Sequence, residues 1–188
     1  MPVEIAKPYL DPRAKELLAA IPAPRKALFL DRDGVINVDH NYVCKPGDTE
    51  WVPGIFELCA EAQRAGYLLV VVTNQAGIAR GYYSAKEFLT YTQWVHEQFA
   101  LKGAPLIATY YCPHHPDFTP VCECRKPMPG MISSAIADLE LERTSCVLVG
   151  DKKSDLQAGA AAGLVSSRLI CLVDHYAAAV LNKLDIWK

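Results

Sequence analysis

The sequence has no hydrophobic run long enough to cross a membrane and no strong excess of either charge. None of its apolar stretches approaches the roughly 18 residues that a membrane span needs. Its 19 Lys and Arg against 21 Asp and Glu leave a formal net charge of −2. Such a balance argues against a general nucleic-acid or membrane-binding surface. Internal repeats and low-complexity segments are also missing. We therefore expect a globular protein without nucleic-acid or membrane partners.

The first ten residues lack the apolar core of a secretory signal, so the expected location is the cytoplasm. In that setting, 7 cysteines argue against a framework of disulfides. With 188 residues, of which 51% are apolar and 21% charged, the chain suits one domain with a sizeable core.

Residues 1–24 are predicted to be an N-terminal extension, and residues 25–188 the folded domain. Residues 11–20 can form one amphipathic helix, which Pro22 and Pro24 would stop. That helix could pack on the surface of its own chain or serve as an oligomer contact. We expect a monomer, and a dimer remains an alternative.

From residue 27 onward, strand-like and helix-like patterns alternate. Apolar runs of strand length lie at 27–30, 68–72, 106–111, 146–149 and 168–173. Helical patterns begin near Ile55, at the capping box of Ser84 and Glu87, at Pro129 and near Ser154. Repeated strand–helix–strand units predict an α/β, Rossmann-like fold of three layers around a mainly parallel sheet. No block between the motifs is large enough for a cap domain.

Polar residues follow several of the predicted strands. Asp31 and Asp33 come directly after the first strand, and their like charges are costly at a buried strand end. Ligands bind at the carboxyl ends of parallel strands, so the polar residues that follow the strands should lie together at one rim of the sheet. Besides Asp31 and Asp33, these are Thr73, Lys126, Asp151 and Asp155.

This set of side chains suits phosphoryl transfer. Mg²⁺ prefers oxygen ligands, which Asp31, Asp151 and the backbone carbonyl of Asp33 can supply. Asp31 would attack phosphorus to form an aspartyl-phosphate, and Asp33 would act as general acid and then as general base. Thr73 and Lys126 would stabilise the phosphoryl oxygens. Asp155 would hold a metal-bound water or orient Lys126.

The chain thus has four motifs: 31–34, Thr73, Lys126, and Asp151 with Asp155. In order and placement, they resemble those of the haloacid dehalogenase (HAD) superfamily of phosphatases. The resemblance covers roughly residues 26–172 and implies a HAD-like phosphatase domain within 25–188. Dehalogenases of this superfamily typically lack the second aspartate, since a halide needs no proton. Asp33 therefore favours cleavage of a phosphate ester.

A second cluster joins three cysteines and a histidine. Cys112, Cys122 and Cys124, with an imidazole from His114 or His115, fit tetrahedral Zn²⁺ in a closed structural site. The loop is rich in proline and polar residues, so a zinc staple would order it and hold Lys126 in place. Reduced, unligated thiols are the alternative. The other cysteines are expected to pack as small apolar residues: Cys44, Cys59, Cys146 and Cys171.

Four segments further resemble the D-glycero-D-manno-heptose-1,7-bisphosphate 7-phosphatase family: 37–43, 72–81, 110–116 and 122–127. The resemblance implies Zn²⁺ on Cys112, His114, Cys122 and Cys124. It also implies substrate contacts from Asp39, His40, Asn41, Tyr42, Thr73, Asn74, Gln75, Ala76, Arg125, Lys126 and Lys152.

The implied role is Mg²⁺-dependent hydrolysis of heptose bisphosphate, a small phosphorylated sugar, in ADP- or GDP-heptose and lipopolysaccharide core or surface polysaccharide biosynthesis. Two alternatives stay open. One is a histidinol-phosphate phosphatase of histidine biosynthesis. The other, of another class, is a phosphosugar-binding protein without turnover.

Overall fold

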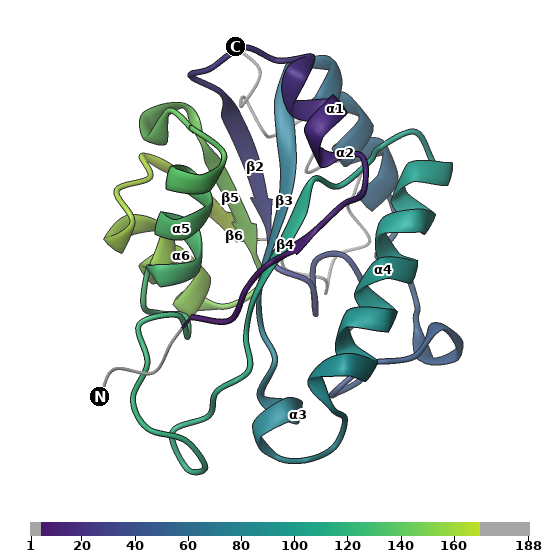
Figure 1. Cartoon of the computed structure of the whole chain (residues 1–188), viewed down its shortest axis with the longest axis vertical. Helices are drawn as coiled ribbons and strands as arrows, with labels where there is room; N and C mark the ends of the chain where they lie inside the picture. The colour runs from purple at the N-terminus through teal and green to yellow at the C-terminus, as the bar shows by residue number, and fades with distance from the viewer. Residues whose placement is uncertain (1–4, 170–188) are drawn as a thin grey trace.

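Six strands form one sheet in the computed structural model, which describes residues 5–169. The strands lie in the order β1-β4-β3-β2-β5-β6 (Figure 1). Five of them pair in parallel: β2 (Lys26–Leu30), β3 (Tyr67–Asn74), β4 (Ala108–Cys112), β5 (Val147–Gly150) and β6 (Ser166–Leu169). The mainly parallel sheet is confirmed. The strand expected at 168–173 begins two residues earlier, and Cys171 and residues 170–173 lie outside the described residues.

Successive residues of each central strand face two different cores. In β2, Ala27 and Phe29 pack in the core that includes α5 (Gly130–Asp138) and α6 (Lys153–Ala161). Leu28 and Leu30 face α2 (Ile55–Arg64) and α4 (Ala85–Leu101). Because side chains alternate along a strand, a run that is apolar throughout buries both faces of the sheet. Figure 1 shows the resulting three layers, with α5 and α6 on one side and α4 on the other.

The helices begin close to where the sequence predicts them. The capping box of α4 is confirmed, since Ser84 Oγ accepts from the Glu87 backbone and Glu87 accepts from the Ser84 backbone. Pro129 precedes α5, as expected for a proline at a helix start. The four-residue helix α3 (Ala76–Ala79) was not predicted, because so short an element has no apolar period. In residues 5–169, no helix is long and apolar enough to cross a bilayer, and no insertion forms a separate domain.

The N-terminal segment takes part in the sheet. Strand β1 (Tyr9–Leu10) pairs antiparallel with β4, which the sequence analysis missed because two residues show no alternation. Helix α1 (Ala14–Ala19) is shorter than the predicted 11–20. It starts later because the Asp11 side chain accepts hydrogen bonds from the backbone and guanidinium of Arg13, and also contacts buried His96.

We expect Asp11→Asn to lower the free energy of unfolding by about 1–3 kcal/mol, the usual loss for a weakened buried polar network. Asp11 is 3% exposed, and its Oδ2 lies 3.1 Å from His96 Nδ1. Burial acts to raise the pKa of Asp11, but hydrogen bonds from His96 and Arg13 outweigh it and lower that pKa. The stabilisation is therefore present above the unfolded pKa of about 4 and is lost as the pH falls below it.

Urea unfolding of Asp11→Asn and wild type at several pH values measures this difference. The exposed carboxylate of Asp48 provides the matched control, Asp48→Asn, which should change stability by less than about 0.5 kcal/mol. A difference between wild type and Asp11→Asn that stays constant below pH 4 would contradict the assignment.

Candidate active site

A cavity of about 360 Å³ lies where the carboxyl ends of β2 and β3 meet the loops after β4 and β5. Twelve of the predicted site residues line it: Asp31, Asp33, Asp39, Asn41, Tyr42, Asn74, Gln75, Ala76, Arg125, Lys126, Lys152 and Asp155. The lining residues do not include Thr73, His40 or Asp151, all of which are described. The prediction that strand ends bring the polar motifs to one rim agrees with this arrangement.

Lys126 links the carboxylates of two motifs. Its Nζ lies 2.9 Å from Asp31 Oδ1 and 2.6 Å from Asp155 Oδ1, and it donates to the Val72 carbonyl at 2.8 Å. Burial acts to lower the pKa of Lys126, but the two carboxylates raise it above its ordinary value. The amine is therefore a fixed cation. Asp155 Oδ2 also accepts from the Lys152 backbone, so the geometry favours the orienting role of Asp155 over that of holding water.

Asp31 and Asp151 have the properties of cation ligands. Together with Asp155, each brings one carboxylate oxygen to within 4.8 Å of the others. Burial raises the pKa of Asp31 to about 6, against the effect of Lys126, and burial also raises the pKa of Asp151. Among the described residues, buried Asp151 Oδ1 finds no hydrogen-bond partner. Because an unpartnered buried carboxylate oxygen is costly, these residues fit a hard divalent cation such as Mg²⁺.

Gly34 lets the two strand ends come this close. Its φ is +92°, which residues with a side chain rarely adopt. A Cβ at this position would overlap the carboxylate of Asp151. The glycine of the Asp31–Gly34 motif is therefore needed to bring Asp151 beside Asp31.

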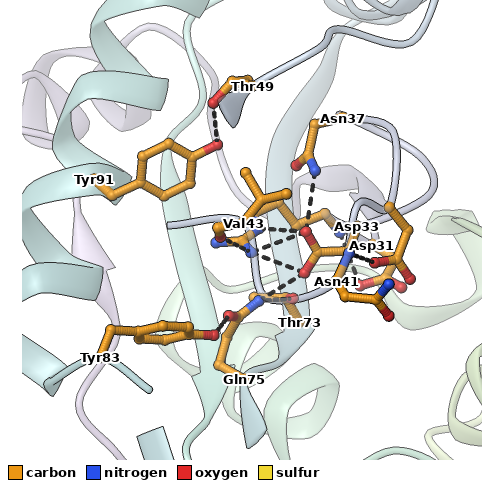
Figure 2. Close-up of polar contacts among 12 residues, drawn as sticks. Asp31, Asp33, Asn37, Asn41, Val43, Thr49, Thr73, Gln75, Tyr83 and Tyr91 are labelled. Atoms are coloured by element: carbon orange, nitrogen blue, oxygen red, sulfur yellow. Dashed lines mark hydrogen bonds and ion pairs between the residues drawn. The ribbon is translucent and has the colours of Figure 1, made fainter. Parts of the chain in front are cut away.

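Asp33 is held by donors on both of its oxygens (Figure 2). Oδ1 accepts from Arg32 and from Asn37 Nδ2 at 3.0 Å. Oδ2 accepts from Arg32 Nη2 at 2.8 Å and from Gln75 Nε2 at 3.1 Å. The carboxylate therefore lines the cavity in a defined orientation.

Two of the predicted substrate residues, Thr73 and Asn74 at the end of β3, also make hydrogen bonds to other residues of the site. Asn74 Oδ1 accepts from the Lys126 backbone at 3.0 Å, and Asn74 Nδ2 donates to the Lys126 carbonyl at 3.1 Å. Both ends of this amide therefore hold the backbone of Lys126. Thr73 is 1% exposed at the end of β3, where its hydroxyl accepts from Gln75 Nε2.

The loop after β2 forms the opposite wall. Asn41 and Tyr42 have φ of 61° and 56°, and such a left-handed pair is uncommon outside functional loops. Lys152 Nζ lies 3.2 Å from Asp39 Oδ2 across the opening. His40 instead faces Glu50, with Nε2 2.8 Å from Oε2, and it does not line the cavity.

The cysteine cluster lies beside this cavity. Ligand atoms of Cys112, His114, Cys122 and Cys124 all lie within 4.8 Å of one another. The Sγ atoms of Cys112 and Cys122 are 3.7 Å apart, near the roughly 3.8 Å that tetrahedral Zn²⁺ with Zn–S bonds of about 2.3 Å would impose, and those of Cys112 and Cys124 are closer, at 3.1 Å. The hydrogen-bonded contact with Cys112 lowers the pKa of Cys124 to about 5, which favours the metal-binding thiolate.

Of the two candidate histidines, His114 faces the sulfur atoms, with Nδ1 3.2 Å from Cys124 Sγ. The ring of His115 instead has Nε2 3.1 Å from Arg80 Nη2. The loop also contacts the cavity wall, because Arg125 Nη1 donates to the His114 carbonyl. As predicted, Cys59 and Cys146 pack in the two cores, and the half-buried Cys44 packs against the core that contains Cys59.

Sequence reasoning missed four residues around the site: Arg32, Asn37, Tyr83 and Ser154. Arg32 carried a signal, since a cation between two aspartates after a buried strand must pair with one of them. It is 3% exposed, and its guanidinium lies over the rings of Phe88 and Tyr91. Tyr83 lines the cavity from the loop before α4 and Ser154 from the first turn of α6, and no local pattern marks either as a site residue.

Comparison with known proteins points in the same direction. A family model described as HAD-hydrolase-like matches residues 123–173. D-glycero-beta-D-manno-heptose-1,7-bisphosphate 7-phosphatase of Vibrio cholerae serotype O1 is 48% identical over 151 residues, 78% of this chain and 81% of that protein. The D-glycero-alpha-D-manno-heptose-1,7-bisphosphate 7-phosphatase of Burkholderia mallei is also 48% identical, over 78% of this chain and 80% of its own length.

A solved structure agrees with these relatives. It is the crystal structure of D,D-heptose 1,7-bisphosphate phosphatase from B. bronchiseptica complexed with magnesium and phosphate. That protein is 31% identical, and its TM-score is 0.73 over 85% of this chain and 97% of the other.

Proposed function

Since this chain belongs to the family of D-glycero-D-manno-heptose-1,7-bisphosphate 7-phosphatases, with a HAD-like fold, we propose that it hydrolyses the 7-phosphate of that sugar bisphosphate. The observation that carries the proposal is the position of Asp31, which lines the cavity between Lys126 and Asp151. The reaction would serve the synthesis of activated heptose for lipopolysaccharide core or surface polysaccharides.

Asp31 is the proposed nucleophile. One of its oxygens bonds to phosphorus while the bond from phosphorus to the sugar oxygen breaks. Lys126 Nζ, at 2.9 Å from Asp31 Oδ1, orients the attacking carboxylate and balances the charge of the phosphoryl oxygens. Thr73 donates its hydroxyl proton to one of those oxygens.

Asp33 is the proposed proton carrier. It protonates the departing sugar alkoxide, then takes a proton from the water that attacks the phosphoryl-aspartate and releases inorganic phosphate. Asp31, Asp151 and the Asp33 carbonyl would hold Mg²⁺. When bound, this ion supplies positive charge that allows an anionic nucleophile to approach an anionic phosphate.

We propose that Arg125 and Lys152 bind the second phosphate of the substrate. Both line the cavity, and both are cationic and can donate charge-assisted hydrogen bonds. The Asp39–Lys152 ion pair across the opening supports a role for the 39–42 loop in holding the sugar.

A zinc ion held by Cys112, His114, Cys122 and Cys124 is part of the proposal. Four protein ligands leave no open position for water, so this site would be structural. Cys124 lies two residues before Lys126, so the metal would hold the loop that carries Arg125 and Lys126.

We expect heptose 1,7-bisphosphate to give a kcat/KM at least about 100-fold above that of histidinol phosphate. A charge-assisted hydrogen bond contributes about 1.5–3 kcal/mol, and each 1.4 kcal/mol is a factor of ten. Histidinol phosphate carries a single phosphate, so it offers no second anion for Arg125 and Lys152 to bind. Steady-state assays of phosphate release with both anomers of the sugar and with histidinol phosphate make the comparison.

A matched pair of lysine variants tests the second phosphate site. Lys152→Gln should reduce the preference for the bisphosphate about tenfold, the loss of one weak charge-assisted contact. Its neighbour Lys153 is exposed and does not line the cavity, so Lys153→Gln should leave the preference unchanged. The opposite substrate ranking would assign the chain to histidinol-phosphate hydrolysis. Binding of the bisphosphate without turnover would indicate a phosphosugar-binding protein.

A further inference from the structure

Gln75 joins two of the proposed catalytic groups through one buried amide. It is 1% exposed, and its Nε2 donates to Asp33 Oδ2 at 3.1 Å and to Thr73 Oγ1 at 2.8 Å. Its Oε1 accepts from the hydroxyl of Tyr83 at 2.6 Å. Figure 2 shows this chain running from Tyr83 through Gln75 to Asp33 and Thr73.

The chemistry of the end groups determines the direction of every bond in this chain. In its ionised form, in which it acts as general base, Asp33 only accepts hydrogen bonds, so the amide must present its nitrogen to the carboxylate. The amide oxygen then faces Tyr83, whose phenol has to be the donor. If the amide were flipped, its oxygen would face the carboxylate and the contact would become repulsive. Tyr83 thus selects the amide orientation that Asp33 requires.

The same bond sets the direction of the Thr73 hydroxyl. Because Thr73 Oγ1 already accepts from Gln75 at 2.8 Å, its own proton remains available for another acceptor. In the proposed reaction that acceptor is a phosphoryl oxygen. A single side chain therefore orients both the proton carrier and the phosphate donor.

Local packing holds Tyr83 in this position. The residue is 9% exposed and packs with Phe88 and Tyr111. Its phenol lies against Gly77 of α3, where any Cβ would overlap the ring. Burial raises the pKa of Tyr83, so the hydroxyl keeps the proton that it donates.

We propose that Tyr83 and Gln75 are positioning residues of the phosphatase site, which orient Asp33 for proton transfer and Thr73 toward the phosphoryl group. This inference rests on the proposed hydrolysis of a phosphate ester. It gives the Gln75 side chain a role beyond the substrate contact that the family resemblance implies, and it gives Tyr83 a role where the sequence indicated none.

The test is Tyr83→Phe, which removes the donor hydroxyl and keeps the ring. Its kcat/KM for heptose bisphosphate should fall about 10–100-fold, the usual loss for a residue that orients a catalytic group. For an activated aryl phosphate the loss should be several-fold smaller, because that leaving group departs without a proton from Asp33. A simple alkyl phosphate serves as a third substrate.

Tyr110→Phe is the matched control. Tyr110 is 1% exposed and donates to Asp138 at 2.9 Å on the opposite face of the sheet. Tyr110→Phe should lower kcat/KM for the sugar, aryl and alkyl phosphates by less than about twofold. Gln75→Glu, which sets a carboxylate against Asp33, should lower kcat/KM for the alkyl and sugar phosphates at least as much as Tyr83→Phe.

Two results would overturn the inference. The first is a Tyr83→Phe enzyme with wild-type kcat/KM on the alkyl and sugar phosphates. The second is an equal loss on all three substrates, which would show that Tyr83 does not act through proton transfer by Asp33. Hydrolysis of alkyl and aryl phosphates without hydrolysis of heptose bisphosphate would instead contradict the proposed substrate, and the leaving-group comparison would still decide the role of Tyr83.

Discussion

Asp31→Asn should lower kcat for heptose bisphosphate by on the order of 10⁵-fold or more, the scale seen when an enzyme loses its nucleophile. The amide has almost the same shape as the carboxylate, so substrate binding and the cavity should persist, but it cannot form the phosphoryl intermediate. Initial-rate assays measure the loss. Rapid acid quench and mass spectrometry of the wild type should find phosphate on the peptide that carries Asp31.

The fold should tolerate this change. Asp31 is one of three carboxylates near a single lysine, and Lys126 keeps its shorter ion pair, 2.6 Å to Asp155, when Asp31 is neutralised. We therefore expect a loss of less than about 1 kcal/mol in the free energy of unfolding, measured by urea titration. Asp48→Asn, an exposed change of the same kind, should leave both kcat and stability near the wild type. Substantial turnover by Asp31→Asn would rule out the aspartyl-phosphate mechanism.

The second large effect is expected when the cysteine site is broken. Cys124→Ser should lose the bound zinc, loosen the loop from 113 to 125 and lower kcat at least about 100-fold, as expected when the support of a catalytic group fails. The physical reason is that the cysteine cluster is close in the chain to the catalytic lysine. The Glu123 carbonyl accepts from the Gly130 backbone, and Lys126 follows Cys124 by two residues. Structural zinc contributes about 10–16 kcal/mol to folding in zinc-finger peptides. Even part of that free energy would be the main contribution to keeping this loop ordered.

Zinc content, limited proteolysis of the loop and kcat of the same preparation measure the three effects together. Cys44→Ser is the control, because Cys44 is a half-buried thiol outside the cluster and its variant should retain about one zinc per chain. Wild-type protein purified under reducing conditions without zinc, yet fully active, would favour the reading of the cluster as free thiols.

Much of the fold follows from local patterns. The central strands carry the apolar runs 27–30 and 68–72 because both faces of the sheet are covered, and Ser84 and Glu87 predict the capping box of α4. The elements that escaped prediction are short. Strand β1 and helix α3 have two and four residues, too few to show a period, and tertiary contacts decide their conformation.

By itself, the sequence determined which chemistry this protein can perform. The carboxylates, the threonine and the lysine follow strands of a parallel sheet, and that topology alone brings strand ends to one rim. The tertiary structure decided how those groups are held. Asn74 holds the Lys126 backbone from 52 residues away, and Asp155 rather than solvent faces Lys126 Nζ.

The tertiary structure also decided that Tyr83 donates to Gln75, and that His114 rather than His115 faces the three sulfur atoms. These choices depend on the direction of a hydrogen bond or the rotation of a ring. Such details are set by neighbours packed from distant segments, and no spacing along the chain encodes them.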